Sequence, residues 1–349
     1  MKKRWKWILP PLALLLAFAG LFAWNYFKKP FHKGDLTGAA AADAAVGRAV
    51  PSMDVNGDGD FTILQINDTH LITSRGKDEK TIDAIAAQLD RLKPDLVVAA
   101  GDILDGFNSK IFVNKRAALC ALADMFELRG QYWAYVPGNN DGEYLGSTAD
   151  VTAFLAENYA YCILSNPPGL SGETQYAIPL READGNVVHE LIFMDSLMRD
   201  PETHYLTYDS FKQDQADWLL AQLTELKEQA PNARASVFFH MNTPAFSEAK
   251  NRGEAYAEGY AMIDFPDNWA IQGNYIVDDA MRAAGNVGLV SIGHLHPPVN
   301  WCAYLGTTYY HITRPAGYQV TKRPGGAKIT IHTADGNPRR LYEFEEIVF

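Results

Sequence analysis

The sequence has few cysteines, and their positions argue against a cysteine zinc site and against a lipoprotein. Only three of its 349 residues are cysteine, and none has the spacing of a zinc-binding motif. We interpret Cys120, Cys162 and Cys302 as small buried apolar residues. An oxidising compartment would allow one pair to form a disulfide, and the sequence does not indicate which pair. No cysteine lies near the end of the N-terminal apolar run, which argues against a lipoprotein.

Acidic residues are absent from the first 34 positions of the chain, and the first one is Asp35. Seven of the 31 basic residues lie in the first 33 positions, so the rest of the chain carries 24 basic against 42 acidic residues, a formal charge of −18. Nucleic-acid binding relies on the neutralisation of phosphates, so this charge argues against a nucleic-acid partner. A phosphorylated substrate would need local positive charge, as bound metal ions provide.

The N-terminal segment 1–33 is typical of a membrane-targeting segment. Basic residues flank an uncharged run of 21 residues from Trp7 to Phe27, and about 20 residues suffice to cross a bilayer. The sequence at 17–19, Ala-Phe-Ala, fits a signal-peptidase site, but the apolar run continues beyond it to Trp24. We therefore expect an uncleaved anchor that holds the body outside the cytosol, with secretion after cleavage as the alternative.

The remaining chain divides into a tether and one large domain. Residues 34–58 are rich in glycine and alanine and predict a flexible tether. The motif at 54–60, DVNGDGD, is similar to the start of a calcium loop, but Gln65 stands where a bidentate glutamate is needed, so we interpret it as a turn. Residues 59–349 alternate apolar β-rich runs with helical patterns and end in a β-rich stretch. This order predicts an α/β domain of two packed sheets flanked by helices.

Apolar periodicity predicts the helices of this domain. They are expected at 80–92, 115–128, 151–159, 208–229 and 275–285. The stretch 244–273 shows no clear periodicity and follows His240. Long irregular segments in compact domains are usually functional, so we expect this stretch to form a pocket wall.

Five short polar motifs carry the functional signal. Each directly follows an apolar, β-rich run, and ligands bind at the carboxyl ends of strands in α/β sheets. We therefore expect them to meet at one sheet edge. The motifs are Asp68-Thr69-His70, Gly101-Asp102, Gly138-Asn139-Asn140-Asp141, His240, and Gly293-His294-Leu295-His296.

These residue types predict a site for two metal ions. Asp68 and His70 are two residues apart, as are His294 and His296, so each pair can reach one ion. A shared carboxylate, for which Asp102 is placed, allows two cations to lie about 3.5–4 Å apart. Imidazoles mixed with carboxylates suit iron, manganese or zinc better than calcium or magnesium.

With these motifs the chain resembles the calcineurin-like metallophosphoesterases over 61–311. Their pattern is D-x-H, GD, GN-H-D/E, H and GH-x-H, and SVFFHMNTPAF, DWLLAQL, GHLHPPVN and RPAGY are similar to the short, single-domain relatives of purple acid phosphatases. The resemblance implies a four-layer α/β/β/α sandwich. It also implies that one metal is bound by Asp68, His70 and His296, that the other is bound by Asn139, His240 and His294, and that Asp102 bridges them.

The resemblance further implies a reaction, the hydrolysis of a phosphate ester. A hydroxide bridging two divalent or trivalent ions (iron, manganese or zinc) would attack phosphorus in line with the leaving group. A phosphorylated small molecule or a phosphoprotein is the expected substrate, and monoesterase and diesterase activity are both open.

Two positions depart from the family pattern. Asn140 stands where a histidine is the usual general acid, and asparagine cannot donate a proton in that way. His204 or His311 could replace it, or each could be structural. A non-catalytic module that binds metal or phosphate without turnover is therefore the alternative to an enzyme. Asp105 replaces the tyrosine that colours purple acid phosphatases, so no iron–tyrosinate colour is expected.

Two further carboxylates are candidates for a supporting role. Asp141 is expected to orient a neighbouring ligand, and together with Asp102 and Asn140 it completes the predicted catalytic residues. Asp195 follows an apolar run and could act in the same way, or could simply begin a turn. A purely structural membrane protein in which all these motifs are incidental would bind no metal.

Overall fold

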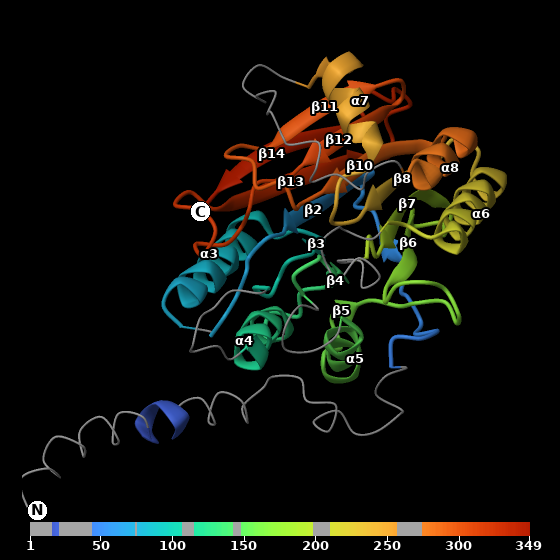
Figure 1. Cartoon of the computed structure of the whole chain (residues 1–349). Coiled ribbons are helices and arrows are strands. Elements are labelled where there is room, and N and C mark those ends of the chain that lie inside the picture. The colour runs from blue at the N-terminus through green and yellow to red at the C-terminus, as the bar shows by residue number, and fades with distance from the viewer. Residues whose placement is uncertain are drawn as a thin grey trace, which may run out of the picture.

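A computed structural model describes residues 16–20, 44–73, 75–106, 115–141, 148–197, 210–256 and 274–349. Two β-sheets pack face to face, and helices cover their outer faces (Figure 1). This confirms the α/β class and the two mixed sheets flanked by helices.

The six-stranded sheet contains the first three motif-bearing strands. Its order is β14-β13-β2-β3-β4-β5. Strands β2 to β5 are parallel, and β13 pairs antiparallel with β2 on one side and β14 on the other. The strands are β2 (Asp60–Ile66), β3 (Leu96–Ala100), β4 (Trp133–Val136), β5 (Cys162–Ile163), β13 (Gly325–His332) and β14 (Tyr342–Val348).

The eight-stranded sheet contains the other two motif-bearing strands. Its order is β1-β6-β7-β8-β10-β12-β11-β9, and β7, β8, β10 and β12 run parallel. The strands are β1 (Met53–Asp54), β6 (Gln175–Arg181), β7 (Val187–Met194), β8 (Arg234–Phe238), β9 (Glu254–Ala255), β10 (Val287–Ile292), β11 (Trp301–Leu305) and β12 (Thr308–Ile312).

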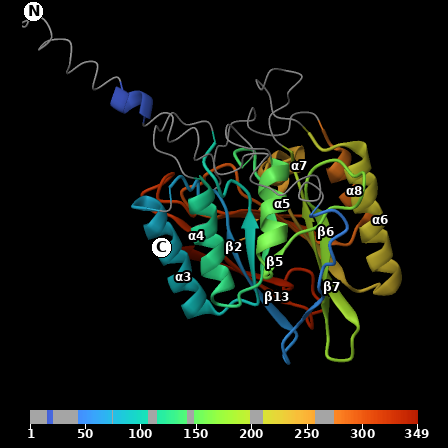
Figure 2. The same ribbon diagram turned by 90° about the horizontal axis from the view of Figure 1, so that it is seen from below.

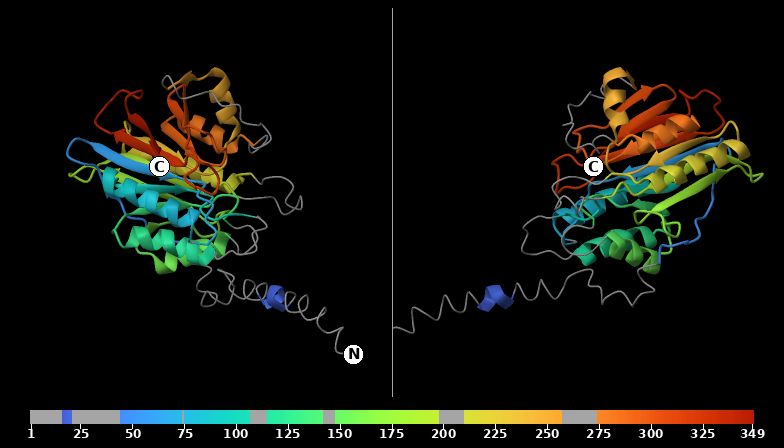
Figure 3. Two further views of the ribbon diagram at one scale, coloured as in Figure 1. Left: turned by 90° about the vertical axis from the view of Figure 1, so that its left-hand side faces the viewer. Right: turned by 45° about the vertical axis from the view of Figure 1, so that its right-hand side comes forward.

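Two groups of helices cover the sheets. Helices α3 (Lys77–Leu92), α4 (Lys115–Glu127) and α5 (Thr148–Asn158) lie side by side along the six-stranded sheet (Figure 2). On the far side of the molecule, α6 (Gln213–Gln229) and α8 (Ile276–Ala284) pack together on the eight-stranded sheet, and α7 (Pro244–Arg252) contacts β11 (Figure 3).

Alternation along the strands divides the core into two hydrophobic layers. In β7 and β8, Phe193 and Phe238 join the core of the six-stranded sheet and stack with ring centroids 5.2 Å apart. Their neighbours Ile192 and Phe239 point the other way, into the core beneath α6 and α8. Successive strand side chains alternate between faces, so a strand with both faces covered is apolar throughout.

The predicted helices are confirmed, with one additional helix and one later start. The stretch 244–273 was expected to be irregular, but its residues 244–252 form helix α7. This helix begins with Pro244, because the fixed φ of proline suits a first helical position. Ala245, Phe246 and Ala249 are the only residues of this helix that are fully buried, so its apolar stripe is too short to give a clear period. Residues 257–273 lie outside the described residues. Helix α6 begins at 213 rather than 208, and 208–209 also lie outside.

The N-terminal predictions lie largely outside the described residues. Of the expected anchor 1–33 the structure describes only 16–20, and no helix among the described residues is long and apolar enough to cross a membrane. Within the expected tether, Ala45 is buried, Val46 pairs with Asn166, and β1 pairs with β6. This described part is therefore not a free tether, and the domain boundaries at 33 and 58 stay predictions.

The turn predicted at 54–60 is confirmed. Asn56 accepts hydrogen bonds from the backbone N–H groups of Asp58 and Asp60 through its side-chain oxygen, both at 2.9 Å. Gln65 lies in β2, where its side-chain oxygen accepts a hydrogen bond from Ser291. It therefore belongs to the packing between the sheets.

Candidate metal centre

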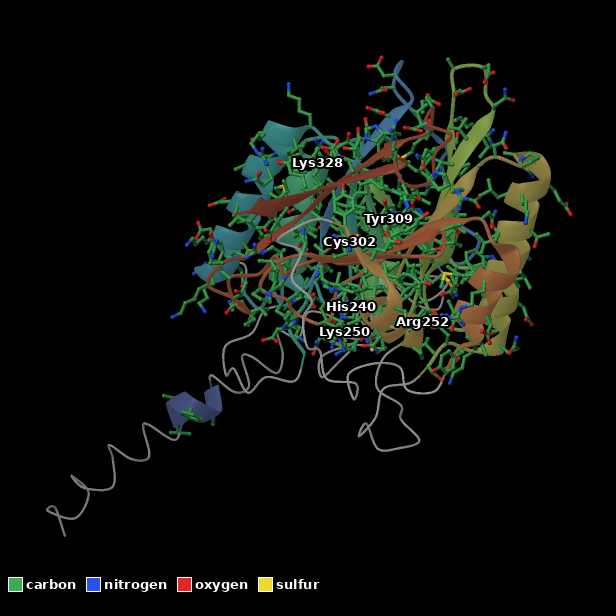
Figure 4. The ribbon with its side chains drawn as sticks, turned by 90° about the horizontal axis from the view of Figure 1, so that it is seen from above. His240, Lys250, Arg252, Cys302, Tyr309 and Lys328 are labelled. Atoms are coloured by element: carbon green, nitrogen blue, oxygen red, sulfur yellow. The ribbon has the colours of Figure 1, made fainter. Side chains whose placement is uncertain are left out.

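The five polar motifs meet at one edge of the two sheets. They follow the carboxyl ends of β2, β3 and β4 in one sheet and of β8 and β10 in the other. Figure 4 shows His240 toward this edge, with Cys302 and Tyr309 farther along the sheets. The contact across the edge is direct, because the His294 N–H donates to Asp68 Oδ2 at 3.0 Å.

The first of two ligand clusters contains Asp68, His70, Asp102 and His296, whose candidate ligand atoms all lie within 4.8 Å of one another. His296 Nε2 is 3.1 Å from Asp68 Oδ1 and 3.4 Å from His70 Nε2. His70 Nε2 lies 3.6 Å from Asp102 Oδ2. The two carboxylates are buried, while the His296 side chain is 32% exposed, so this cluster opens toward solvent.

The second cluster contains Asp102, His240 and His294, all buried. His240 Nε2 is 3.3 Å from Asp102 Oδ2, the same oxygen that His70 approaches. Asp102 therefore belongs to both clusters. Asn139 lies in the turn after β4 and is 2% exposed.

The backbone is strained at the ligand positions. Asp68, His70, Asp102, His294 and His296 all have positive φ, between 45° and 68°. Non-glycine residues rarely adopt this conformation, and such strain concentrates at functional sites. Among the described residues only two other non-glycine residues share it, Lys93 at the end of α3 and Leu197 beyond β7.

Two imidazoles are oriented through their second ring nitrogen. His240 Nδ1 lies 2.8 Å from the Ala100 carbonyl oxygen, and His70 Nδ1 lies 3.5 Å from Asp105 Oδ1. A histidine ligand usually donates its other N–H to a carbonyl or carboxylate, which directs the free nitrogen to the metal. Both contacts direct Nε2 toward the clusters. Nothing in the sequence indicates this orienting role for Asp105 beyond its position three residues after Asp102.

Burial and the neighbouring charges shift the pKa values of the cluster residues in opposite directions. Burial lowers the pKa of His70 and of His240, but hydrogen bonds and nearby carboxylates outweigh it and raise them to about 10 and about 9. Burial, assisted by the charge of His240, lowers the pKa of His294 to about 3. Burial raises the pKa of Asp102, but His240 and His70 outweigh it and hold that pKa well below its usual range. A metal ion must compete with protons on His70 and His240, because neutral imidazole is the ligand.

Asp141 ties together the loops that carry Asp102 and Asn139. Its two oxygens accept the backbone N–H groups of Leu104 and Gly138, both at 2.8 Å. Burial, followed by the charge of Asp102, raises its pKa to about 6. Asp141 therefore holds these two ligand-bearing loops in place relative to each other.

Asp195 lies at the end of β7 and supports a neighbouring loop. Its oxygens accept the N–H groups of Glu173 and Leu197. Burial raises its pKa to about 7. Asp195 thus joins the segment before β6 to the strand end.

The two histidines considered as general acids have different outcomes. His311 is fully buried in β12, where its Nδ1 lies 2.8 Å from Ser291 Oγ and its ring stacks on Phe344. It is a structural residue between the sheets. His204 lies outside the described residues.

The connection after β12 braces the first ligand loop, a contact that the sequence did not reveal. The N–H groups of Ala316 and Gly317 donate to the carbonyl oxygens of Asn67 and Asp68, at 2.9 and 3.2 Å. A side chain on Gly317 would collide with the Thr69 backbone. The glycine of the RPAGY segment is therefore required by close packing.

The donor set fits a pair of metal ions. Asn139 Oδ1 is buried and has no hydrogen-bond partner among the described residues. Buried polar atoms are nearly always satisfied, so this oxygen, next to the Asn140 backbone N–H that binds Asp102, indicates an electropositive partner. Oxygen and imidazole nitrogen together suit iron, manganese or zinc.

Comparison with known proteins agrees with this geometry. The calcineurin-like phosphoesterase family matches residues 61–298. No curated protein sequence matches the chain. A dimetal phosphatase from Danio rerio has a similar structure, with a TM-score of 0.52 and 14% identity over 82% of this chain and 99% of that one.

Two other solved structures are more distant. The GAP50 anchor of the Plasmodium inner membrane complex has a TM-score of 0.46 and 12% identity over 83% of this chain and 89% of that one. An archaeal phosphodiesterase has a TM-score of 0.39 and 12% identity over 83% and 100%. The family match spans most of the chain and all five motifs, so this protein belongs to the calcineurin-like phosphoesterase family and is a metal-dependent phosphoesterase.

Proposed function

We propose that the chain hydrolyses phosphate esters at a centre of two metal ions that share Asp102. The single observation that carries this proposal is the pair of clusters with Asp102 in common. Asp68, His70 and His296 would hold one ion with Asp102, and Asn139, His240 and His294 would hold the other. Iron, manganese and zinc fit these donors best.

The chemistry of such a pair of ions is well defined. When bound, two ions lower the pKa of a shared water to near neutrality and neutralise charge on the phosphoryl oxygens. The residues of the chain set the geometry. Asp102 fixes the spacing of the two sites, the Ala100 carbonyl and Asp105 aim the imidazoles of His240 and His70, and Asp141 holds the two loops together.

The proposed substrate is a phosphorylated small molecule or a phosphoprotein. The −18 charge of the chain after residue 33 disfavours nucleic acid. The more exposed first cluster gives an ester access from solvent. Asn140 offers a hydrogen bond but no proton, so diesters and esters with good leaving groups fit this site as well as simple monoesters.

A paired assay tests the proposal and separates the two ester classes. The full-length chain, purified in mild detergent and loaded with manganese, iron or zinc, would be given p-nitrophenyl phosphate and bis-p-nitrophenyl phosphate. Asp102→Asn removes the shared charge, and Asp83→Asn, an exposed aspartate on α3, is the matched control. We expect hydrolysis that requires metal and Asp102 but is unaffected at Asp83.

The outcomes separate the candidate functions. Preference for one ester assigns the monoesterase or the diesterase. Two metal ions bound without cleavage of either ester would support the non-catalytic module instead. A chain that binds no metal would contradict both functions.

We further propose that segment 1–33 holds the enzyme at a membrane with its catalytic domain outside the cytosol. The basic flanks and the 21-residue uncharged run support this location. Fractionation of cells that express the full chain and a chain lacking 1–33 tests it. The full chain should remain with membranes after a high-salt wash, and the shortened chain should not.

A further inference from the structure

Two asparagines each bind one of the two carboxylates of the metal centre. Asn67 Nδ2 donates to Asp68 Oδ2 at 2.5 Å, and Asn140 Nδ2 donates to Asp102 Oδ2 at 2.5 Å. Asn67 and both carboxylates are almost completely buried. Resting on the proposed binuclear function, we infer that Asn67 and Asn140 are paired positioning residues, the first serving one metal site and the second serving both.

Asn67 lies where two ligand-bearing segments meet the connection after β12. Its amide also donates to the Thr313 carbonyl oxygen at 3.2 Å, and a side chain on Gly293 would lie 2.8 Å from its Nδ2. The amide therefore fills the space between the first motif, the last motif and the connection after β12. That position fixes it in the orientation that meets Asp68.

The two carboxylate oxygens of Asp68 have different partners. Oδ2 accepts from Asn67 Nδ2 and from the His294 N–H. Oδ1 lies 3.1 Å from His296 Nε2 and 3.8 Å from His70 Nε2 in the first cluster, and 3.9 Å from His240 Nε2 in the second. One oxygen is thus anchored by the protein, and the nearest ligand to the other is His296 of the first cluster.

Asn140 holds Asp102 at both oxygens. Its backbone N–H donates to Oδ1 at 2.8 Å while its amide donates to Oδ2. Oδ2 is the oxygen near both His240 and His70, so its position sets the geometry of both clusters. A neutral amide holds this oxygen without adding a positive charge that would oppose two cations.

Metal binding, measured by calorimetry and by metal content per chain, tests the inference. The variants are Asn67→Ala and Asn140→Ala in the full-length chain, titrated with manganese. Loss of such supporting partners typically weakens metal affinity about 10–100-fold. We expect Asn67→Ala to weaken one of two binding events by this factor and Asn140→Ala to weaken both.

Two controls separate positioning from packing. Asn186→Ala removes a similarly short hydrogen bond, Asn186 Nδ2 to Asp184 Oδ2 at 2.6 Å, in the exposed turn between β6 and β7, and should leave both binding events unchanged. Asn67→Leu and Asn140→Leu keep much of the volume without the donor, so they should lose affinity as the alanine variants do. If a variant fails to fold without metal, Asn67→Ser or Asn140→Ser replaces it.

Several results would overturn the inference. The first is full metal affinity in the leucine variants. The second is an equal loss of affinity for both ions in Asn67→Ala. The third is unchanged metal affinity in Asn67→Ala or in Asn140→Ala. A wild-type chain that binds no metal would overturn it together with the proposed function. Two ions bound by the wild type with no ester cleaved would contradict the hydrolase alone, and the pattern of binding losses would still support the pair of asparagines.

Discussion

The Nδ1 atom of His240 lies 2.8 Å from the carbonyl oxygen of Ala100, the last residue of β3. His240 itself follows β8, so this contact joins the two sheets at the edge where the polar motifs meet. A carbonyl oxygen only accepts, so Nδ1 carries the hydrogen and Nε2 is directed toward Asp102, 3.3 Å away. The second cluster therefore depends on the packing of one sheet against the other.

Replacement of His240 tests this dependence. His240→Ala removes one imidazole from the buried cluster, so we expect the chain to lose one metal ion and hydrolysis to fall by more than about 100-fold. Metal content and the hydrolysis rate are the measurements. His332→Ala is the control, because His332 pairs with Asp60 in β2 and belongs to neither cluster. Unchanged metal content in His240→Ala would contradict its assignment.

Gly101 is predicted to be required for the same contact. Its φ is +84°, and a Cβ there would lie 2.5 Å from His240 Nδ1. We expect Gly101→Ala to displace the imidazole and to lower both metal affinity and rate. Gly130→Ala is a matched comparison, since Gly130 has a φ of +63° but its nearest neighbour would be 3.4 Å away. Alanine in the left-handed region should cost each variant about 1–2 kcal/mol of stability from the backbone, and only Gly101→Ala should lose metal. Equal metal binding in the two variants would argue against a contact-specific role.

The sequence predicts much of the site because its ligand spacing is local. The pairs Asp68/His70 and His294/His296 and the strand before each motif can be read directly, and parallel strands bring their carboxyl ends together. The contributions of Asn67 and Asp105 could not be predicted. They depend on which atoms a side chain reaches across loops, and residue spacing carries no such information.

The fold was predictable in class and less so in detail. Alternating apolar runs indicate two sheets and most helices, but nothing local places β13 beside β2 or β1 beside β6. Those pairings are set by packing between distant segments. Helix α7 was missed because its buried residues form too short a stripe, and His311 is structural because the strand buries it between the sheets.

Asp141 is predicted to support the centre through loop position. Asp141→Asn keeps one acceptor and turns an amide N–H₂ toward either the Leu104 or the Gly138 N–H. An unsatisfied buried donor costs about 1–3 kcal/mol, so we expect the free energy of unfolding to fall by that amount. Urea unfolding measures it. A variant as stable as the wild type would show that these two hydrogen bonds do not hold the loops.

Stability is predicted to fall with acidification because His189 is buried and neutral. Burial, with the charge of Arg234, lowers its pKa to about 3, whereas an unfolded histidine titrates near about 6.5. Between these values the unfolded state binds one more proton than the folded state. The stabilisation that comes from His189 is therefore fully present above the unfolded pKa and is lost as pH falls. One such group contributes up to about 1.4 kcal/mol per pH unit. His311, whose pKa burial also lowers to about 3, acts in the same direction.

Urea unfolding of the wild type and of His189→Gln at about pH 7 and about pH 5 checks this prediction. The variant lacks the titrating group, so its free energy of unfolding should depend less steeply on pH. The absolute stability of the variant is not the test, because glutamine changes the packing against Ser236 and Tyr342. Identical pH dependence in the two proteins would show that His189 does not set it.

A crystal structure of the manganese-loaded full-length chain, with anomalous data collected at the manganese edge, would show whether the two clusters hold two ions. We expect two anomalous peaks about 3.5–4 Å apart with Asp102 between them. One peak should contact Asp68, His70 and His296, and the other should contact Asn139, His240 and His294. A single peak, or two peaks that do not share Asp102, would contradict a binuclear centre at this edge of the sheets.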